Sequence, residues 1–257
     1  MRAEVETVLI EGLPVRLYAM APAGRVPDDP APIVVFVHGI GMSHRSFARS
    51  QRALAETHST ISVDLPGFGW LRAAGRRLSI EELGDLVVRA VRSRGHDDLV
   101  LIGQSMGAQV VVEAARRHPD AVRSIVLVGP VVVAERRSLA LQAFDLARDG
   151  FVERVRMNAV LVTDYLRSMR QYTRELRPML HYRTEDTIAE VTQPVLVVRG
   201  AQDPIARHDW AERLASAAPI GAFVELAGPH HVQERQPAAF ARLVADFERT
   251  QPVEGPR

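Results

Sequence analysis

Short apolar runs alternate along the chain with longer segments whose apolar residues recur at helical spacing. The runs predict strands at 8–10, 15–20, 33–38, 60–65, 99–103, 124–129, 194–200 and 222–226. The longer segments predict helices at 46–57, 79–95, 105–117, 208–218 and 237–249. This alternation predicts an α/β fold, with a mostly parallel sheet covered by helices on both faces.

Local signals mark several of these elements. The run "IVVFVH" is continuously apolar and rich in β-branched residues, as expected of a strand buried on both faces. Ser79 and Glu82 form a capping-box pattern at the start of the best-marked helix, and Gly95 stops it. The first two runs surround "EGLP" and predict an opening hairpin. The stretch 22–32 is dense in Pro and Asp and predicts a loop, and the tail after residue 248 is expected to fray.

One segment breaks the alternation. Residues 131–193 hold no convincing strand but contain amphipathic helical stretches. We therefore expect a core domain made of residues 1–130 and 194–257, with 131–193 inserted as a helical cap.

Composition narrows the class of protein. The 257 residues are 47% hydrophobic and 25% charged, with a formal net charge of +1, so nothing points to nucleic acid. The chain has no cysteine, which excludes disulfides, thiolate catalysis and cysteine-ligated metal. No secretory signal or membrane-spanning run is recognisable, so a cytoplasmic protein is expected.

The pentapeptide "GQSMG" places Ser105 between Gly103 and Gly107, where a strand pattern becomes a helix pattern. A sharp strand–turn–helix would lift a serine hydroxyl above the sheet as a nucleophile, with glycines where a side chain would collide with backbone. A tight turn with a helix-capping serine explains the same five residues. The motif alone leaves both interpretations open.

A serine nucleophile needs a base and an orienting acid. His230 and His231 lie after the last strand run, and Asp203 follows the run 194–200. Sites in open parallel sheets form beyond the carboxyl ends of strands, where Ser105, Asp203 and His230 would all lie. A metal site at the two histidines lacks a nearby carboxylate pattern, and "GIGMSH" lacks the third glycine of a dinucleotide fingerprint. No metal or cofactor is predicted.

These motifs resemble those of the α/β-hydrolase fold over nearly the whole chain. "FVHGIG" is similar to the family's oxyanion loop, "DLPGFG" to its strand-and-turn signature, and "GQSMG" to its nucleophile elbow. "LVVRGAQDPI" and "GPHHVQERQP" resemble the acid and histidine loops, and 131–193 falls where the family inserts a cap. The resemblance implies an eight-stranded sheet and a serine hydrolase.

The resemblance also implies roles for particular residues. Ser105 would be the nucleophile, His230 the base and Asp203 the acid. The backbone N–H groups of Met106 and Ile40 would bind the oxyanion. His230 is preferred over its neighbour because the family's histidine commonly lies seven positions before a proline that opens the last helix.

Other positions are expected to be structural. In the family's pattern His38 shapes the oxyanion loop, Asp64 ties the following turn, and His231 is left at the mouth of the pocket. The chain departs from the pattern at Trp70 and Leu71, where small polar residues are usual, so that loop is expected to pack against the cap. Pro229 stands where glycine is frequent.

The substrate is the least defined part of the prediction. Apolar cap residues are numerous enough to roof an apolar pocket, although packing within the helical layer is the better explanation for any single one of them: Leu139, Phe144, Phe151, Val155, Met157, Leu161, Tyr165, Met169, Tyr172 and Met179. Four arginines at 167, 170, 174 and 177 are expected to be solvated. The favoured function is acyl-enzyme hydrolysis of a small hydrophobic carboxylic ester or related acyl compound. Thioester, lactone and carbon–carbon bond hydrolysis stay open, as do a non-catalytic ligand-binding role and the choice between monomer and homodimer.

Overall fold

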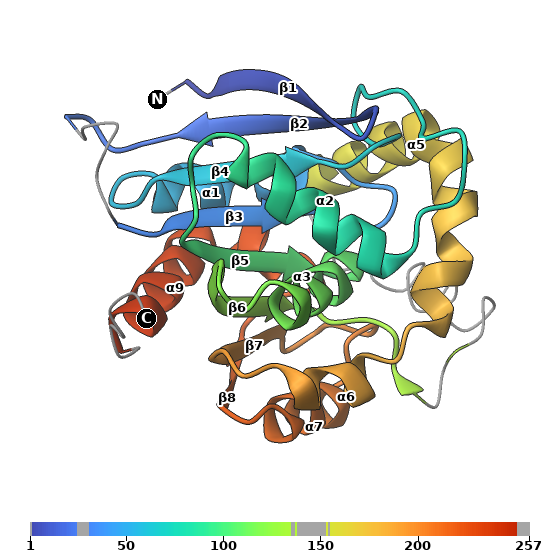
Figure 1. The fold of residues 1–257 in the computed structure, drawn as a ribbon. Coiled ribbons are helices and arrows are strands. Elements are labelled where there is room, and N and C mark those ends of the chain that lie inside the picture. The colour runs from blue at the N-terminus through green and yellow to red at the C-terminus, as the bar shows by residue number, and fades with distance from the viewer. Residues whose placement is uncertain (1, 25–30, 135–136, 138–152, 154, 251–257) are drawn as a thin grey trace.

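The computed structural model describes residues 2–24, 31–134, 137, 153 and 155–250, and they form one eight-stranded sheet (Figure 1). Its strands are β1 (Glu4–Ile10), β2 (Leu13–Met20), β3 (Ile33–Val37), β4 (Thr60–Asp64), β5 (Leu99–Gln104), β6 (Val122–Val128), β7 (Val195–Gly200) and β8 (Gly221–Leu226). Their order across the sheet is β1-β2-β4-β3-β5-β6-β7-β8. Every predicted strand is present.

The sheet is parallel except at one edge. β1 and β2 form the predicted hairpin, turned at Glu11 and Gly12, and β2 pairs antiparallel with β4. All the remaining pairs, from β4–β3 to β7–β8, are parallel. The predicted mostly parallel α/β fold is therefore confirmed.

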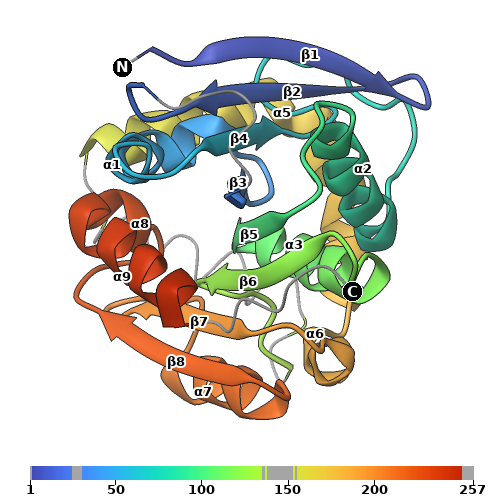
Figure 2. The same cartoon turned by 60° about the vertical axis from the view of Figure 1, so that its left-hand side comes forward.

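Helices cover both faces because the central strands are apolar on both sides. Val35 and Val37 of β3 face one apolar cluster, whereas Val34 and Phe36 face another. α2 (Ile80–Arg92), α3 (Met106–Arg117) and α7 (His208–Ala217) pack against the first cluster. α1 (Ala48–Leu54) and α9 (Pro237–Thr250) pack against the second, on the opposite side in Figure 2.

The predicted capping box at the start of α2 is formed. The Ser79 hydroxyl accepts from the Glu82 backbone N–H at 3.2 Å, and the Glu82 carboxylate accepts from the Ser79 N–H at 2.8 Å. Two short helices were not predicted as separate elements, a 3-10 turn at His44–Phe47 before α1 and α8 (Val232–Arg235) after the histidine loop.

Between the neighbouring strands β6 and β7, the described residues contain helices and no strand. The longest is α5 (Val155–His181), followed by α6 (Thr184–Thr187) and a 3-10 turn at Ile188–Glu190. α5 crosses the sheet at the carboxyl ends of the parallel strands (Figure 1). The predicted limits of the cap, 131 and 193, stay a prediction. Leu139, Phe144 and Phe151 lie outside the described residues, as do 25–30 of the predicted loop and the end of the tail.

Candidate active site

Ser105 lies in a strained turn between β5 and α3. Its backbone has φ 57° and ψ −120°, a positive φ that is uncommon outside glycine. A Cβ on Gly103 would lie 2.1 Å from the Gly107 carbonyl oxygen, and one on Gly107 would lie 2.2 Å from the Val37 carbonyl oxygen. Both glycines are therefore required by backbone contact, as the sequence predicted. Met106 opens α3, where the first N–H groups have no partner within the helix.

Asp203 and His230 lie in contact beyond the ends of β7 and β8. His230 Nδ1 is 2.8 Å from Asp203 Oδ2, and both side chains are buried. Because a carboxylate only accepts, the Nδ1 position carries the proton. The other carboxylate oxygen accepts from the backbone N–H groups of Ile205 at 2.7 Å and Ala206 at 3.0 Å. These three bonds fix the carboxylate in one orientation.

Two residues that the sequence analysis did not single out shape this pair. Gly129, at the end of β6 with φ 53°, leaves the space that the pair occupies, since a Cβ there would lie 2.9 Å from the His230 ring. The buried Arg199 guanidinium donates to the carbonyls of Ala206 at 2.8 Å and Asp203 at 3.1 Å. It braces the loop that carries Asp203.

His231 has a different partner from His230. Its Nδ1 and its backbone nitrogen each lie 2.9 Å from Oε1 of Glu153. Burial raises the pKa of Glu153, but the hydrogen bonds and charge of His231 outweigh it and leave that pKa below its usual range. Of the two adjacent histidines, His230 is therefore the one that contacts Asp203. Glu153 has no signal in the sequence, since its neighbours form no motif.

A cavity of about 300 Å³ joins Ser105, His230 and His231. Its other lining residues are Gly39, Ile40, Met42, Gln104, Val131, Tyr165, Tyr172, Leu176, Met179 and Ile205. The cavity is mostly apolar, and α5 supplies four of its lining residues. Such a concave, apolar site with a few convergent polar groups is typical of a small-molecule pocket.

The apolar cap residues named from the sequence divide into three groups. Tyr165, Tyr172 and Met179 line the cavity, as expected of a roof. Met157 packs with Met42 and Val160 in a small cluster, against which the partly buried Leu161 also lies. Val155 and Met169 are exposed, so they neither line the cavity nor pack in a helical layer.

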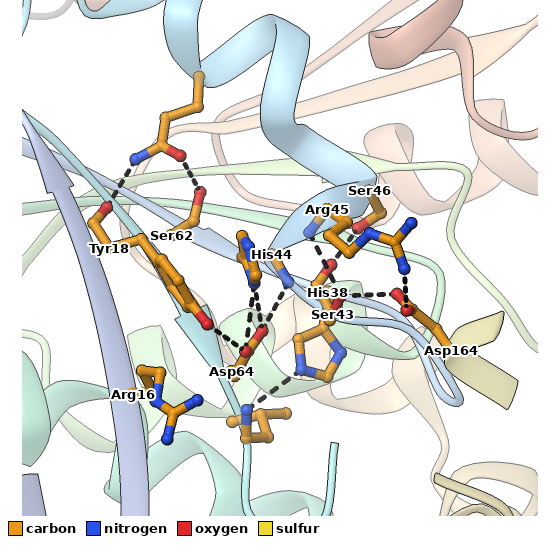
Figure 3. Close-up of polar contacts among 12 residues, drawn as sticks. Arg16, Tyr18, His38, Ser43, His44, Arg45, Ser46, Ser62, Asp64 and Asp164 are labelled. Carbon is orange, nitrogen blue, oxygen red and sulfur yellow. Dashed lines mark hydrogen bonds and ion pairs between the residues drawn. The ribbon is translucent and has the colours of Figure 1, made fainter. Parts of the chain in front are cut away.

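Buried side chains of the core hold the loop after β3, residues 39–45, in place. His38 Nδ1 donates to the Gly39 carbonyl at 2.8 Å, and its Nε2 accepts from the Leu65 backbone N–H at 3.1 Å. Burial lowers the pKa of His38 and keeps it neutral. Asp64 accepts from the backbone N–H of His44 at 2.6 Å and from the Tyr18 hydroxyl at 2.9 Å (Figure 3). His38 thus holds the loop, as predicted. Asp64, which was expected to tie the turn that follows it, bonds instead to His44 of this loop.

Trp70, where the chain departs from the family's pattern, contacts α5 in the predicted cap segment. The Arg167 guanidinium of α5 lies 4.1 Å from the centre of the exposed Trp70 ring, a cation–π contact.

Among the described residues, no group of three or more His, Cys, Asp or Glu side chains is arranged to hold a metal ion. Within the same residues, no helix is long and apolar enough to cross a membrane.

The chain belongs to the alpha/beta hydrolase family, whose model matches residues 34–243. It is similar to 2-(acetamidomethylene)succinate hydrolase of Mesorhizobium japonicum, with 25% identity over 84% of this chain and 87% of the relative. It is also similar to pimeloyl-[acyl-carrier protein] methyl ester esterase of Nitrosospira multiformis, with 28% identity over 70% of this chain and 80% of the relative. Both relatives are hydrolases.

Solved structures support the fold. A crystal structure of E-2-(acetamidomethylene)succinate hydrolase superposes with a TM-score of 0.79 at 20% identity, covering 97% of this chain and 100% of that chain.

Proposed function

We propose that this protein hydrolyses a small hydrophobic carboxylic ester or related acyl compound through a Ser105–His230–Asp203 triad. The observation that carries the proposal is the hydrogen bond between His230 and Asp203 beside a cavity that Ser105 also lines. The strained backbone at Ser105 adds support, because strain of this kind is concentrated at functional sites. Hydrolase relatives over most of the chain agree with it.

The chemistry follows from these groups. Ser105 Oγ attacks the acyl carbon while His230 takes its proton, and the carbonyl oxygen becomes an oxyanion facing the N–H groups of Met106 and Ile40. Collapse breaks the bond to the leaving alcohol, which takes the proton from His230, and leaves an acyl-enzyme. Water then attacks the acyl carbon with His230 again as base, releasing the acid and restoring the Ser105 hydroxyl. Asp203 stabilises the charged imidazole in both steps.

Residues 131–193 would act as the cap that selects the substrate. α5 contributes Tyr165, Tyr172, Leu176 and Met179 to the cavity, and these walls suit an apolar acyl or alcohol group. An ester hydrolase among the relatives is consistent with an ester substrate.

Labelling with a fluorophosphonate probe, read by intact mass, tests the triad. We expect one adduct on the wild type and none on Ser105→Ala or His230→Ala, because the phosphorus is attacked only by an activated serine. His231→Ala is the matched control, since its side chain is equally buried beside the same cavity and should leave labelling in place. Folded wild type that stays unlabelled, and that turns over no short-chain aryl ester, would point instead to a ligand-binding protein.

A further inference from the structure

One turn of α5 is bonded to the 39–45 loop, although the two are more than a hundred residues apart in the sequence. The Ser43 hydroxyl donates to Asp164 Oδ2 at 2.6 Å, and the Arg45 guanidinium donates to Oδ1 at 2.7 Å. Figure 3 shows the Asp164 carboxylate, which comes from α5, between these two donors. Asp164 is 1% exposed, so a carboxylate is buried here that the proposed chemistry does not use.

The same turn of α5 makes two more contacts with the loop. The Ser168 hydroxyl shares its one donor hydrogen between the Gly41 carbonyl oxygen, at 3.1 Å, and the Asp164 carbonyl oxygen, at 2.8 Å, so it bridges the loop and the helix backbone. The Tyr165 ring lies directly over Gly41, where an added Cβ would be 2.8 Å from it. We call Asp164, Tyr165 and Ser168 the cap latch.

The bonds on the 39–45 loop fix the direction of particular N–H groups. In a trans peptide the carbonyl and the N–H of the next residue point in opposite directions. The Gly39 carbonyl accepts from His38 Nδ1 at 2.8 Å and from the Met42 backbone N–H at 3.1 Å, which sets where the Ile40 N–H points. The Gly41 carbonyl and the Met42 N–H share one peptide, and Ser168 holds its carbonyl end. The latch therefore supports the peptide that orients Ile40.

We propose that Asp164 and Ser168 are positioning residues for the oxyanion, acting through the backbone N–H of Ile40. This inference rests on the proposed function, since it assumes that Ile40 binds the oxyanion. A backbone N–H stabilises the oxyanion only when it already points at the developing charge. α5 supplies part of this preorganisation from outside the predicted core domain. The site is complete only with α5 in place.

The energetics agree with a positioning role. Removing a carboxylate from water is unfavourable, and its two charge-assisted bonds offset much of that penalty without making it a strong source of stability. An apolar side chain at position 164 could be buried without this desolvation penalty. What a carboxylate adds is two directional bonds, to Ser43 and Arg45, that fix the loop in one geometry.

Two variants test the latch, Asp164→Asn and Ser168→Ala. We expect each to lower kcat on an aryl ester by roughly ten- to a hundredfold while KM changes less than about threefold, as misaligned oxyanion donors do. Hydrogen exchange at the amides of residues 38–46 should speed up in both. The matched control is Glu248→Gln, because Ser124 donates to that carboxylate at 2.5 Å near the amino end of β6, far from the pocket. Exchange and kcat should be unchanged there.

A cycle with Ser43→Ala sharpens the result. If the Ser43–Asp164 bond carries the effect, Ser43→Ala should cost little more once Asp164→Asn is present. Should Asp164→Asn fail to fold, Ser168→Ala, which removes one hydroxyl, carries the test by itself.

The possible failures are distinguishable. Unchanged exchange and unchanged kcat overturn the latch and leave the proposed hydrolase intact. Faster exchange with unchanged kcat shows that loop order does not serve catalysis, which overturns the inference. Wild type that neither cleaves esters nor reacts with the probe overturns the proposed function and the catalytic meaning of the latch together.

Discussion

Gly129 shows how closely a single residue limits the site. Its φ of 53° suits glycine, and the space beside it is filled by His230 and Asp203. We predict that Gly129→Ala lowers the rate of fluorophosphonate labelling by about a hundredfold or more, because the new methyl group displaces the imidazole from the carboxylate. Labelling rate and circular dichroism, measured on the same sample, separate a lost site from a lost fold.

A glycine elsewhere controls for backbone strain. Gly75 has φ 78°, and a Cβ there would meet nothing within 4 Å. Gly75→Ala should therefore lose only the stability that a positive φ costs an alanine, and it should react with the fluorophosphonate probe at the wild-type rate. Equal losses in both variants would mean that strain, and not contact with His230, accounts for the effect at 129.

Local sequence predicted the candidate residues better than it predicted their supports. Ser105, Asp203 and His230 each sit in a short motif next to a strand, so their positions at the sheet edge could be inferred; their catalytic roles stay predictions. Arg199 was missed because its acceptors are backbone carbonyls, whose positions follow from the folded loop and not from the side chains of the motif. Glu153 and Asp164 were missed because their partners are 78 and 121 residues away.

At the scale of elements, α5 departs from the expected amphipathic pattern. Its buried face carries a polar series, Asp164, Ser168, Gln171 and Glu175, at the spacing where apolar residues are usual. Val155, Val162, Leu166 and Met169 lie on the exposed side. Periodicity predicted that this segment is helical, but the choice of inner face depended on contacts with the 39–45 loop and the turn at Gly67.

Glu175 makes the stability of this helix depend on pH. Burial raises its pKa to about 8, and a hydrogen bond from Gln171 Nε2 at 2.6 Å opposes that only in part. Between its ordinary pKa, near 4.5, and about 8, the folded protein holds a proton that the unfolded chain has lost. Stability therefore falls as pH rises through this window, by at most about 1.4 kcal/mol per pH unit.

We predict that Glu175→Gln removes most of this dependence. Its free energy of unfolding in urea should fall less steeply than that of wild type as pH rises from about 5 to about 8, and should exceed that of wild type at the upper end. Glu212→Gln, on the exposed side of α7, is the control and should follow the wild-type curve. Parallel curves for Glu175→Gln and wild type would contradict the prediction.

At the scale of the whole molecule, the candidate site residues of the core lie together at the carboxyl ends of the parallel strands. The loops after β3, β5, β6, β7 and β8 contribute Gly39, Ser105, Gly129, Asp203 and His230 respectively. The alternation of apolar runs and helices was sufficient to predict this sheet, because each element has its own periodicity. How α5 lies across these strand ends could not be predicted, since it depends on polar contacts between distant segments.

The cap latch has a consequence for how the protein responds to heat. The sheet is held by two large apolar clusters, whereas this part of α5 rests on a cluster of three buried residues and a few polar bonds. Segments with few buried apolar contacts open before the whole molecule unfolds. We predict that the proposed hydrolytic activity fails several degrees below the melting midpoint seen by circular dichroism and returns fully on cooling. Coincident midpoints would show that α5 and the sheet melt as one unit; separate midpoints would mean that warming switches the enzyme off while its fold survives.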